Sequence, residues 1–215
     1  MKNDNLNILK HEHLLFPIYV AQYSNFLNEE QIRDIYSYCI NENTMQHPAI
    51  TGDAKSSHSE CSQLISKISK DVKNCEELEN ILHAISNEYA KSLGLLGEIA
   101  ISNSWFNLQN EGSILIDHIH PGSLFSGALY INVDDDSSRL YFKNPNTFLI
   151  HLHEQDSNIN PDSRNYLSPS YWVKPKAGCL IIFPSWLYHG SSYKENKTTN
   201  RTVISFNTQY RNRRT

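Results

Sequence analysis

The chain has 215 residues, of which 39% are hydrophobic and 11% aromatic. This length suits one ordinary domain with a sizeable core, and the composition excludes collagen-like chains and disordered chains rich in Pro and Gly. Nineteen Lys and Arg against 23 Asp and Glu give a net charge of −4. Such a chain has no basic field to attract a polyanion, so we expect no nucleic-acid partner.

The sequence also carries information about the cellular location of the protein. No apolar run approaches the roughly 20 residues of a membrane-spanning helix, and the N-terminal stretch MKNDNLNILKHEH lacks the apolar segment of a signal peptide. We therefore expect a cytoplasmic protein with no membrane partner. The cysteines are widely spaced and form no Cys-x-x-Cys pair, which predicts reduced packing residues: Cys39, Cys61, Cys75 and Cys179.

Residues 1–97 predict one strand followed by helices. The apolar run 14–20 contains Pro17, which cannot donate a ladder hydrogen bond, so this run is expected to be an edge strand. Asn28 can cap the helix that follows, because Gln31 stands three residues further on, as in a capping box. The apolar face of this helix consists of Ile32, Ile35, Tyr36 and Cys39.

Two further segments complete the N-terminal part. Residues 41–60 are polar, rich in Ser and without a period, so they predict a loop. From Val72 to Leu93, apolar residues recur at steps of three and four, which predicts one helix. Gly94 stands where a C-cap is expected.

After Ile99 the pattern changes to short alternating runs rich in β-branched and aromatic residues. The predicted strands lie within 100–108, 113–119, 126–133, 138–142, 170–173, 179–183 and 201–210. Helices first and strands second predict an α+β fold, with the helices bracing one face of a sandwich or barrel. The polar interval 144–170 is either a functional lid or a surface loop.

Three histidines stand out as candidate metal ligands. Residues two apart on a strand face the same side, so His118 shares a face with His120, while Asp117 faces the other way. A lone His-x-His pair is common at exposed strand ends, but His189 lies just beyond another predicted strand and can supply a third imidazole. The pairs His11 and His13, and His151 and His153, are expected to be surface histidines.

Arg201 opens the last predicted strand and shares a face with Val203, Ser205 and Asn207. A fixed guanidinium can hold a carboxylate through two parallel hydrogen bonds, which would suit a dicarboxylate whose other end chelates a metal. The alternative is an arginine paired with a buried Asp or Glu. The basic tail formed by Arg211, Arg213 and Arg214 is expected to be a solvated chain end.

Three separated motifs carry a family resemblance: HIHPGS at 118–123, SGALYIN at 126–132 and FPSWLYHG at 183–190, followed by RTVISFN at 201–207. In this order they resemble the 2-oxoglutarate and iron(II)-dependent oxygenases, particularly a small bacterial and phage-encoded group. The resemblance implies a double-stranded β-helix core of the jelly-roll, cupin-like type. On this basis residues 1–215 form a single oxygenase domain, with the core at 98–210.

The resemblance also implies roles for the candidate residues. Iron(II) would be bound by His118 and His189, and His120 stands where most of the family has Asp or Glu. We expect His120 to be the third ligand, with Asp117 as the alternative if a bulge re-aims it. Further expected contacts, to 2-oxoglutarate, come from Arg201, Tyr130, Ser205 and Asn107.

The implied reaction uses O2 to oxidise an unidentified organic substrate, a small molecule, a peptide or a protein side chain, most often by hydroxylation. 2-Oxoglutarate would be decarboxylated to succinate and CO2. One alternative is a three-histidine cupin dioxygenase that does not use 2-oxoglutarate. Another is a non-catalytic jelly-roll binding module, whose ligand patch would comprise Trp172, Trp186 and Tyr188. The edge strand with Pro17 and the N-terminal helices leave room for a homodimer.

Overall fold

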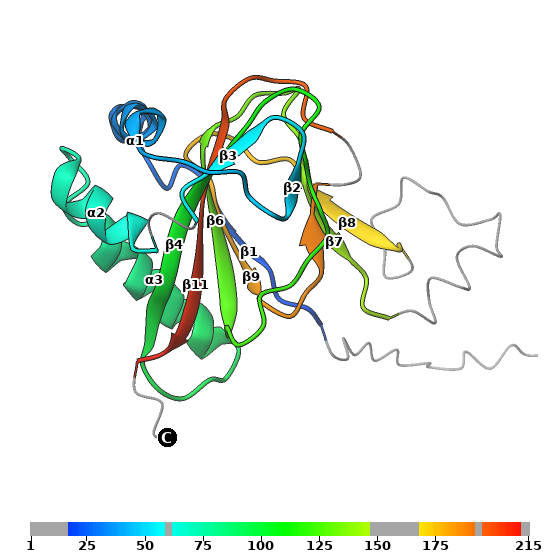
Figure 1. The fold of residues 1–215 in the computed structure, drawn as a ribbon. Helices are drawn as coiled ribbons and strands as arrows, with labels where there is room; N and C mark the ends of the chain where they lie inside the picture. The colour runs from blue at the N-terminus through cyan, green and yellow to red at the C-terminus, as the bar shows by residue number, and fades with distance from the viewer. Residues whose placement is uncertain (1–16, 59–61, 147–167, 192–194, 212–215) are drawn as a thin grey trace, which may run out of the picture.

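The computed structural model describes residues 17–58, 62–146, 168–191 and 195–211 (Figure 1). Several predicted features lie outside these ranges: the pairs His11/His13 and His151/His153, Cys61, Arg213, Arg214 and most of the interval 144–170. None of the described helices is long and apolar enough to cross a membrane.

The first helix, α1 (Glu29–Asn41), forms as predicted. The side chain of Asn28 accepts from the Gln31 backbone N–H at 2.9 Å, and the Gln31 side chain accepts from the Asn28 N–H at 3.1 Å. This capping box satisfies two backbone donors that the first turn leaves unpaired. Ile35 and Cys39 are buried on the face toward the sheet.

The single helix predicted over 72–93 is wrong: the segment contains a break, and a helix before it was missed. The structure has α2 (Leu64–Asp71) and α3 (Leu78–Ser92), and Asn74 between them adopts a left-handed backbone with φ of 61°. Val72 and Cys75 still pack in the core, so the apolar period runs through the break. Gly94, with φ of 75°, follows α3 as the predicted terminator.

Two predictions for the N-terminal loops and strand also need correction. The edge strand is β1 (Ala21–Tyr23), which starts after the described part of the predicted run 14–20. The predicted loop 41–60 contains β2 (Ile50–Thr51) and β3 (Ala54–Ser56), joined by a turn at Gly52 with φ of 80°. These strands are too short to show a period, and they form by pairing with distant strands.

The remaining strands build a large and a small antiparallel sheet (Figure 1). The six-stranded sheet has the order β1-β9-β6-β11-β4-β3. Its long members are β4 (Ile99–Gln109), β6 (Phe125–Asn132), β9 (Leu180–Pro184) and β11 (Arg201–Tyr210). The three-stranded sheet comprises β10 (His189–Gly190), β7 (Leu140–Lys143) and β8 (Ser170–Val173), and β5 (Ile114–Leu115) pairs with β2.

The two faces of β11 enter different cores, as the alternation predicts. Ile204 and Phe206 belong to the cluster between the helices and the large sheet, whereas Val203 belongs to the cluster between the two sheets. Gly127 on β6 makes room for the first cluster, because a Cβ there would lie 2.1 Å from the Phe206 ring. The inner face of β11 is therefore free to build a site between the sheets.

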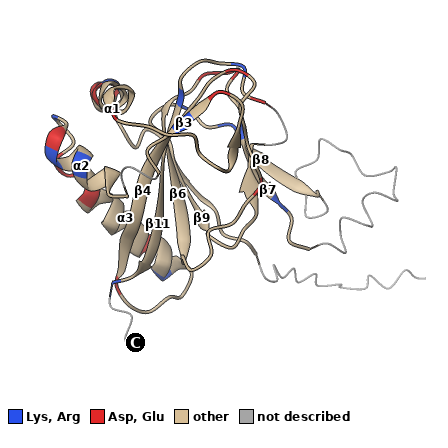
Figure 2. Cartoon of the chain, in the orientation of Figure 1, with Lys and Arg blue, Asp and Glu red and all other residues tan. Residues whose placement is uncertain are grey.

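The described cysteines are buried, as predicted, and the charged side chains lie elsewhere. Cys39, Cys75 and Cys179 are buried free thiols, and burial raises the pKa of Cys75 to about 11. Charged side chains concentrate on the helices and connecting loops, and the strands of the large sheet carry few (Figure 2). The interior between the sheets is thus mainly uncharged.

Candidate metal centre

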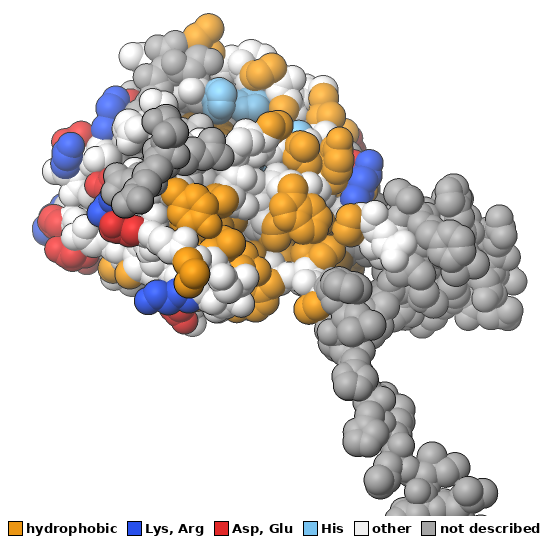
Figure 3. All heavy atoms as spheres, turned by 90° about the horizontal axis from the view of Figure 1, so that it is seen from below, with side chains coloured by type: hydrophobic (Ala, Val, Ile, Leu, Met, Phe, Trp, Pro, Cys, Tyr) orange, Lys and Arg blue, Asp and Glu red, His pale blue; other side chains and the backbone are white. Residues whose placement is uncertain are grey.

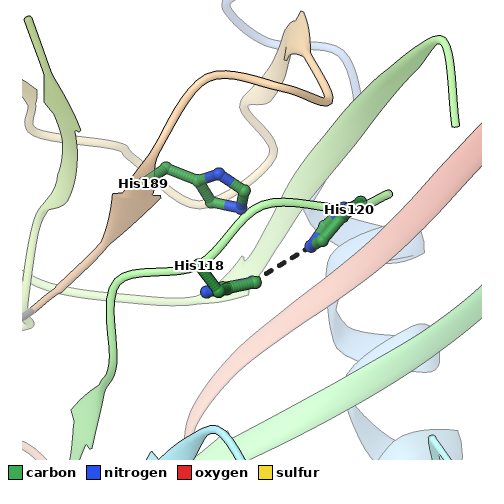
Figure 4. A group of neighbouring side chains, drawn as sticks. All are labelled: His118, His120 and His189. Carbon is green, nitrogen blue, oxygen red and sulfur yellow. Dashed lines mark hydrogen bonds between the residues drawn. The ribbon is translucent and has the colours of Figure 1, made fainter. Parts of the chain in front are cut away.

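Three imidazoles converge between the two sheets (Figure 4). His118 and His120 lie on the segment that follows β5, and His189 opens β10. Reciprocal backbone hydrogen bonds of 3.0 and 3.1 Å join His118 to His189 and fix the two chain segments side by side. Each residue offers a ring nitrogen, and these nitrogens lie within 4.8 Å of one another.

Backbone carbonyls orient two of the three rings. Nδ1 of His118 lies 2.8 Å from the carbonyl oxygen of Ile116, and Nδ1 of His189 lies 2.8 Å from that of Leu187. A carbonyl oxygen only accepts, so each Nδ1 carries the proton. In the neutral ring the lone pair is then on Nε2, which is the arrangement that metal-binding histidines adopt.

Burial keeps these rings neutral. It lowers the pKa of His120 to about 4 and that of His189 to about 3, and it lowers the pKa of His118. The neighbouring imidazoles lower the pKa of His120 and His189 further, because a second positive charge nearby is unfavourable. At neutral pH the cluster therefore presents lone pairs rather than protons.

The spacing of the rings fits a bound metal ion. Nε2 of His118 lies 3.0 Å from Nε2 of His120. Two metal–nitrogen bonds of about 2.1 Å at a right angle place their nitrogens about 3.0 Å apart. Figure 4 draws this contact as a hydrogen bond, which needs a proton on one of the two nitrogens. Oxygen atoms lie within hydrogen-bond distance of Nδ1 in all three rings, so with the protons placed there the contact fits two lone pairs around a shared cation. The donor set and its spacing therefore fit iron(II), which imidazole ligands suit.

The carboxylate of Asp117 lies away from this cluster. It forms an ion pair with Lys143 Nζ at 2.7 Å, and a Cβ on Gly190 would lie 2.8 Å from its Oδ1. Asp117 thus takes the side of the segment opposite to His118, as strand alternation predicts. This geometry supports His120 over Asp117 as the third ligand.

A second polar cluster surrounds Arg201 at the start of β11. The Arg201 side chain is 5% exposed, and its guanidinium donates to the carbonyl oxygen of Ser138 at 3.2 Å and to Oε1 of Gln109. It also bonds the hydroxyl of Tyr130, whose pKa burial raises to about 12. Among the described residues no carboxylate lies within ion-pair distance of Arg201, so the predicted alternative of a buried acidic partner finds no support there.

The groups next to Arg201 have hydrogen atoms to donate. Nε2 of Gln109 and Oγ of Ser138 are buried and have no hydrogen-bond partner within the described part of the chain. Tyr130 keeps its proton at neutral pH because its pKa is raised. A buried positive charge and unpartnered hydrogen-bond donors are both stabilised by an anion, and the described residues supply none at this position. A carboxylate fits that requirement.

One cavity of about 610 Å³ contains both clusters. It is lined by the three histidines, Arg201 and the other predicted residues Tyr130, Ser205 and Asn107. Of the described side chains that line it, only Arg201 carries a formal charge at neutral pH. The structure thus brings together the residues that the sequence predicted separately.

Sequence reasoning assigned no role to Gln109, Ser138 or Asn207. Gln109 lies two residues after Asn107 on β4, so strand alternation places both on the cavity face. Alternation could have added Gln109, and it did place Asn207 on the same face of β11 as Arg201. No sequence pattern points to Ser138, which reaches Arg201 only through the fold.

The cavity also contains a row of rings that the sequence did not predict. The His47 ring lies 5.1 Å from that of His58, which lies 4.9 Å from Trp105, and Trp105 lies 6.0 Å from His120. His47 and His58 come from the segment predicted as a featureless loop. They face the metal centre because β3 pairs with β4.

The aromatic residues suggested for a binding module lie at the surface or near it. Trp186 and Tyr188 are about half exposed, and the Arg139 guanidinium stacks 3.9 Å over the Trp172 ring. Hydrophobic side chains also gather on the face seen from below (Figure 3). None of these three aromatic residues lines the cavity of the histidines.

Comparison with known proteins gives one family. Residues 103–207 match the family described as "Putative 2OG-Fe(II) oxygenase". This region runs from β4 to β11 and contains the three histidines and Arg201. No curated protein matches the chain.

Solved structures share the fold. A prolyl-4-hydroxylase from Pseudomonas putida is 17% identical with a TM-score of 0.58, and the match covers 91% of this chain and 94% of that one. A 2OG-Fe(II) oxygenase family oxidoreductase from Burkholderia pseudomallei is 12% identical with a TM-score of 0.57, covering 88% and 85%. HygX from Streptomyces hygroscopicus is 9% identical with a TM-score of 0.56, covering 90% and 84%.

At such low identities these neighbours establish the fold alone, which is the predicted α+β jelly roll with helices on one face of its larger sheet. The family match adds the chemistry, since the matched residues contain both polar clusters of the cavity. The family match, over just under half of the chain, and the fold of the neighbours together indicate a 2OG-Fe(II)-dependent oxygenase, which uses O2 and an organic substrate.

Proposed function

We propose that His118, His120 and His189 hold iron(II) and that Arg201 anchors 2-oxoglutarate for the hydroxylation of an organic substrate. One observation carries this proposal: three bare imidazole nitrogens and a buried guanidinium without a described carboxylate line the same cavity. The first group lacks a cation and the second an anion. A metal chelated by one end of a dicarboxylate satisfies both.

The histidines hold the metal without moving a proton. Their Nδ1 protons are already placed on oxygen acceptors, so the Nε2 lone pairs face the site before the metal binds. When bound, iron(II) and 2-oxoglutarate together supply the oxidising chemistry, in which O2 is consumed and 2-oxoglutarate becomes succinate and CO2. The protein contributes placement and a dry surrounding.

Arg201 orients the dicarboxylate. Its guanidinium and the Tyr130 hydroxyl would donate to the carboxylate far from the metal, and Gln109 Nε2, which also lines the cavity, adds a donor that has no partner among the described residues. Asn107 and Ser205 line the cavity between this end and the histidines and are proposed as weaker contacts. A carboxylate held by several buried donors binds in one orientation.

The cavity walls decide what reaches the metal. Leu140, Phe183 and Val203 line the side formed by the second core cluster and exclude water from it. His47, His58 and Trp105 line the same cavity and are proposed to contact the organic substrate. HygX, which shares the fold, was crystallised with nickel and 2-oxoglutarate, and this supports a site in this fold that takes a metal ion together with 2-oxoglutarate.

The two alternative functions fit less well. In a three-histidine dioxygenase that works without 2-oxoglutarate, the hydrogen-bond donors around Arg201 would have no anion to bind. A non-catalytic binding module gives no reason for three oriented imidazoles, and its suggested aromatic patch lies outside the cavity.

Iron binding tests the proposal directly. Anaerobic equilibrium dialysis of the full chain with iron(II) is expected to give one ion per chain for the wild type and a loss of at least a hundredfold in affinity for His189→Ala. His83→Ala is the matched control, because His83 lies on α3 and does not line the cavity. Equal affinity of His189→Ala and His83→Ala would remove the histidine cluster as the metal site.

A further inference from the structure

The ring of His120 differs from the other two in how it is oriented. Its Nδ1 contacts side chains rather than a carbonyl: Oδ1 of Asn207 at 2.5 Å and Oγ of Ser126 at 2.7 Å. Asn207 on β11 and Ser126 on β6 are register partners in the large sheet, and their side chains are 8% and 0% exposed. A rigid sheet therefore presents these oxygens to the ring.

The hydrogen bonds around Asn207 form an ordered chain. Ser126 Oγ donates to Asn207 Oδ1 at 2.7 Å and lies 2.7 Å from Ser185 Oγ. The proton of Ser126 is then used on Asn207, so Ser185 donates to Ser126. The carbonyl oxygen of Ser185 accepts from the His120 backbone N–H at 2.9 Å. The network thus holds His120 by both its backbone and its ring.

We propose that Asn207 is a positioning residue for the metal centre: its side-chain oxygen accepts the Nδ1 proton of His120 and so leaves Nε2 bare toward the metal. This inference rests on the proposed function. It assigns a role to a residue that acts on the metal through the ring of His120. Ser126 and Ser185 support that role by holding the Asn207 amide with its oxygen toward the ring.

The need for such a residue follows from the chemistry of position 120. A carboxylate ligand has no proton to place, whereas a neutral imidazole binds through Nε2 only if its proton is on Nδ1. His118 and His189 obtain this from carbonyls two residues earlier in the chain. His120 obtains it from Asn207, so the histidine and the asparagine act as a pair.

Two substitutions separate the acceptor role from a merely structural one. Asn207→Leu keeps the branched shape and the number of side-chain heavy atoms and removes the acceptor. Asn207→Asp provides an acceptor that cannot turn a donor toward the ring. If the Asn207 amide donated to Nδ1 instead, aspartate would fail as leucine does.

Anaerobic equilibrium dialysis with iron(II) alone gives the first readout. Asn207→Leu is expected to lower iron affinity about 10- to 100-fold, the usual effect of losing an outer partner of a ligating histidine, while Asn207→Asp stays within about threefold of the wild type or binds more tightly. Thr208→Val is the matched control: Thr208 neighbours Asn207 on β11, is buried and bonds the Phe125 carbonyl away from the cavity. It should lose stability without losing iron affinity.

The iron–2-oxoglutarate complex gives a second readout that does not depend on turnover. A carboxylate at position 207 makes the His120 ring more electron-donating, so the charge-transfer band of Asn207→Asp should shift to longer wavelength. The double variant His120→Ala/Asn207→Asp should bind iron no better than His120→Ala. Rescue by the second substitution would show that position 207 binds the metal directly and would overturn the inference.

The outcomes separate the two proposals. Wild-type affinity in Asn207→Leu, or equal weakening in Asn207→Asp and Asn207→Leu, overturns the role of Asn207 and leaves the metal centre standing. An equal loss of iron affinity in Thr208→Val also overturns it, because any buried defect in β11 would then suffice. Failure of the wild type to bind iron overturns both proposals.

Discussion

Replacing Arg201 by Met is expected to remove the response to 2-oxoglutarate and to leave the fold and the iron site in place. Methionine fills the space of the arginine stem but provides neither charge nor N–H donors. Arg201 is 5% exposed and no described carboxylate pairs with it, so burial lowers its pKa in the free protein. The variant should therefore be as stable as the wild type or more stable when no ligand is present.

The expected loss of 2-oxoglutarate affinity follows from the burial of the Arg201 guanidinium. Removing one partner of a buried, hydrogen-bonded charge pair costs about 3 kcal/mol of binding, which is roughly 150-fold in Kd. With 2-oxoglutarate at a hundred times the wild-type Kd, the wild type gains about 2.7 kcal/mol of stability and Arg201→Met about 0.3 kcal/mol. For a chain of this size these gains correspond to about 5–10 °C and about 1 °C in Tm.

Thermal unfolding under anaerobic conditions, with iron(II) and with or without 2-oxoglutarate, measures both values. Arg211→Met is the matched control, because Arg211 lies just after β11 and its half-exposed side chain pairs with Glu98 at the surface. It should respond to 2-oxoglutarate as the wild type does. An undiminished ligand shift in Arg201→Met would refute the assignment of Arg201.

Three further substitutions test other parts of the structure. Asp117→Asn should keep iron(II) affinity in equilibrium dialysis within about threefold, because the carboxylate faces Lys143; a loss beyond tenfold would place Asp117 at the metal. Gly127→Ala should lower the free energy of urea unfolding by about 1–3 kcal/mol or more, since the added Cβ meets the Phe206 ring; an unchanged midpoint would contradict the packing. Asn28→Ala should cost about 1 kcal/mol in the same assay through loss of the helix cap, and no loss would contradict the cap.

Features that depend only on residues close together in the chain were predictable from the sequence. The capping box of Asn28 and Gln31 needs only residues three apart, and it forms as expected. The alternation on β11 correctly divided Arg201 and Val203 from Ile204. Each of these patterns is set by the repeat of one element and needs no knowledge of its neighbours.

Features that depend on tertiary pairing were not predictable. The spacing of apolar residues does not reveal the break at Asn74, because Val72 and Cys75 on either side of it both pack in the core. The strands β2 and β3 have two and three residues, too few to show alternation. His47 reaches the cavity only because this segment folds back on β4 and β5.

The sequence was enough to select the candidate metal ligands and the candidate anion-binding arginine. It was not enough to select the neutral residues that hydrogen-bond to them. The residue type alone marks an imidazole as a possible metal ligand and a guanidinium as a possible anion-binding group. His189 and Arg201 could therefore be selected from neighbouring predicted strands. Gln109 and Asn207 are neutral amides of a kind found throughout the chain. Their roles appear only when the sheet brings one against Arg201 and the other against His120.

The central claim is that one cavity binds iron(II) through three histidines and 2-oxoglutarate through Arg201. The measurement that tests it most directly is the visible absorption of the full chain after anaerobic addition of iron(II) and then 2-oxoglutarate. The account predicts a weak charge-transfer band of the chelate in the wild type and in His83→Ala, and none in His189→Ala. Iron binding without the band would contradict it and would favour a dioxygenase that works without 2-oxoglutarate.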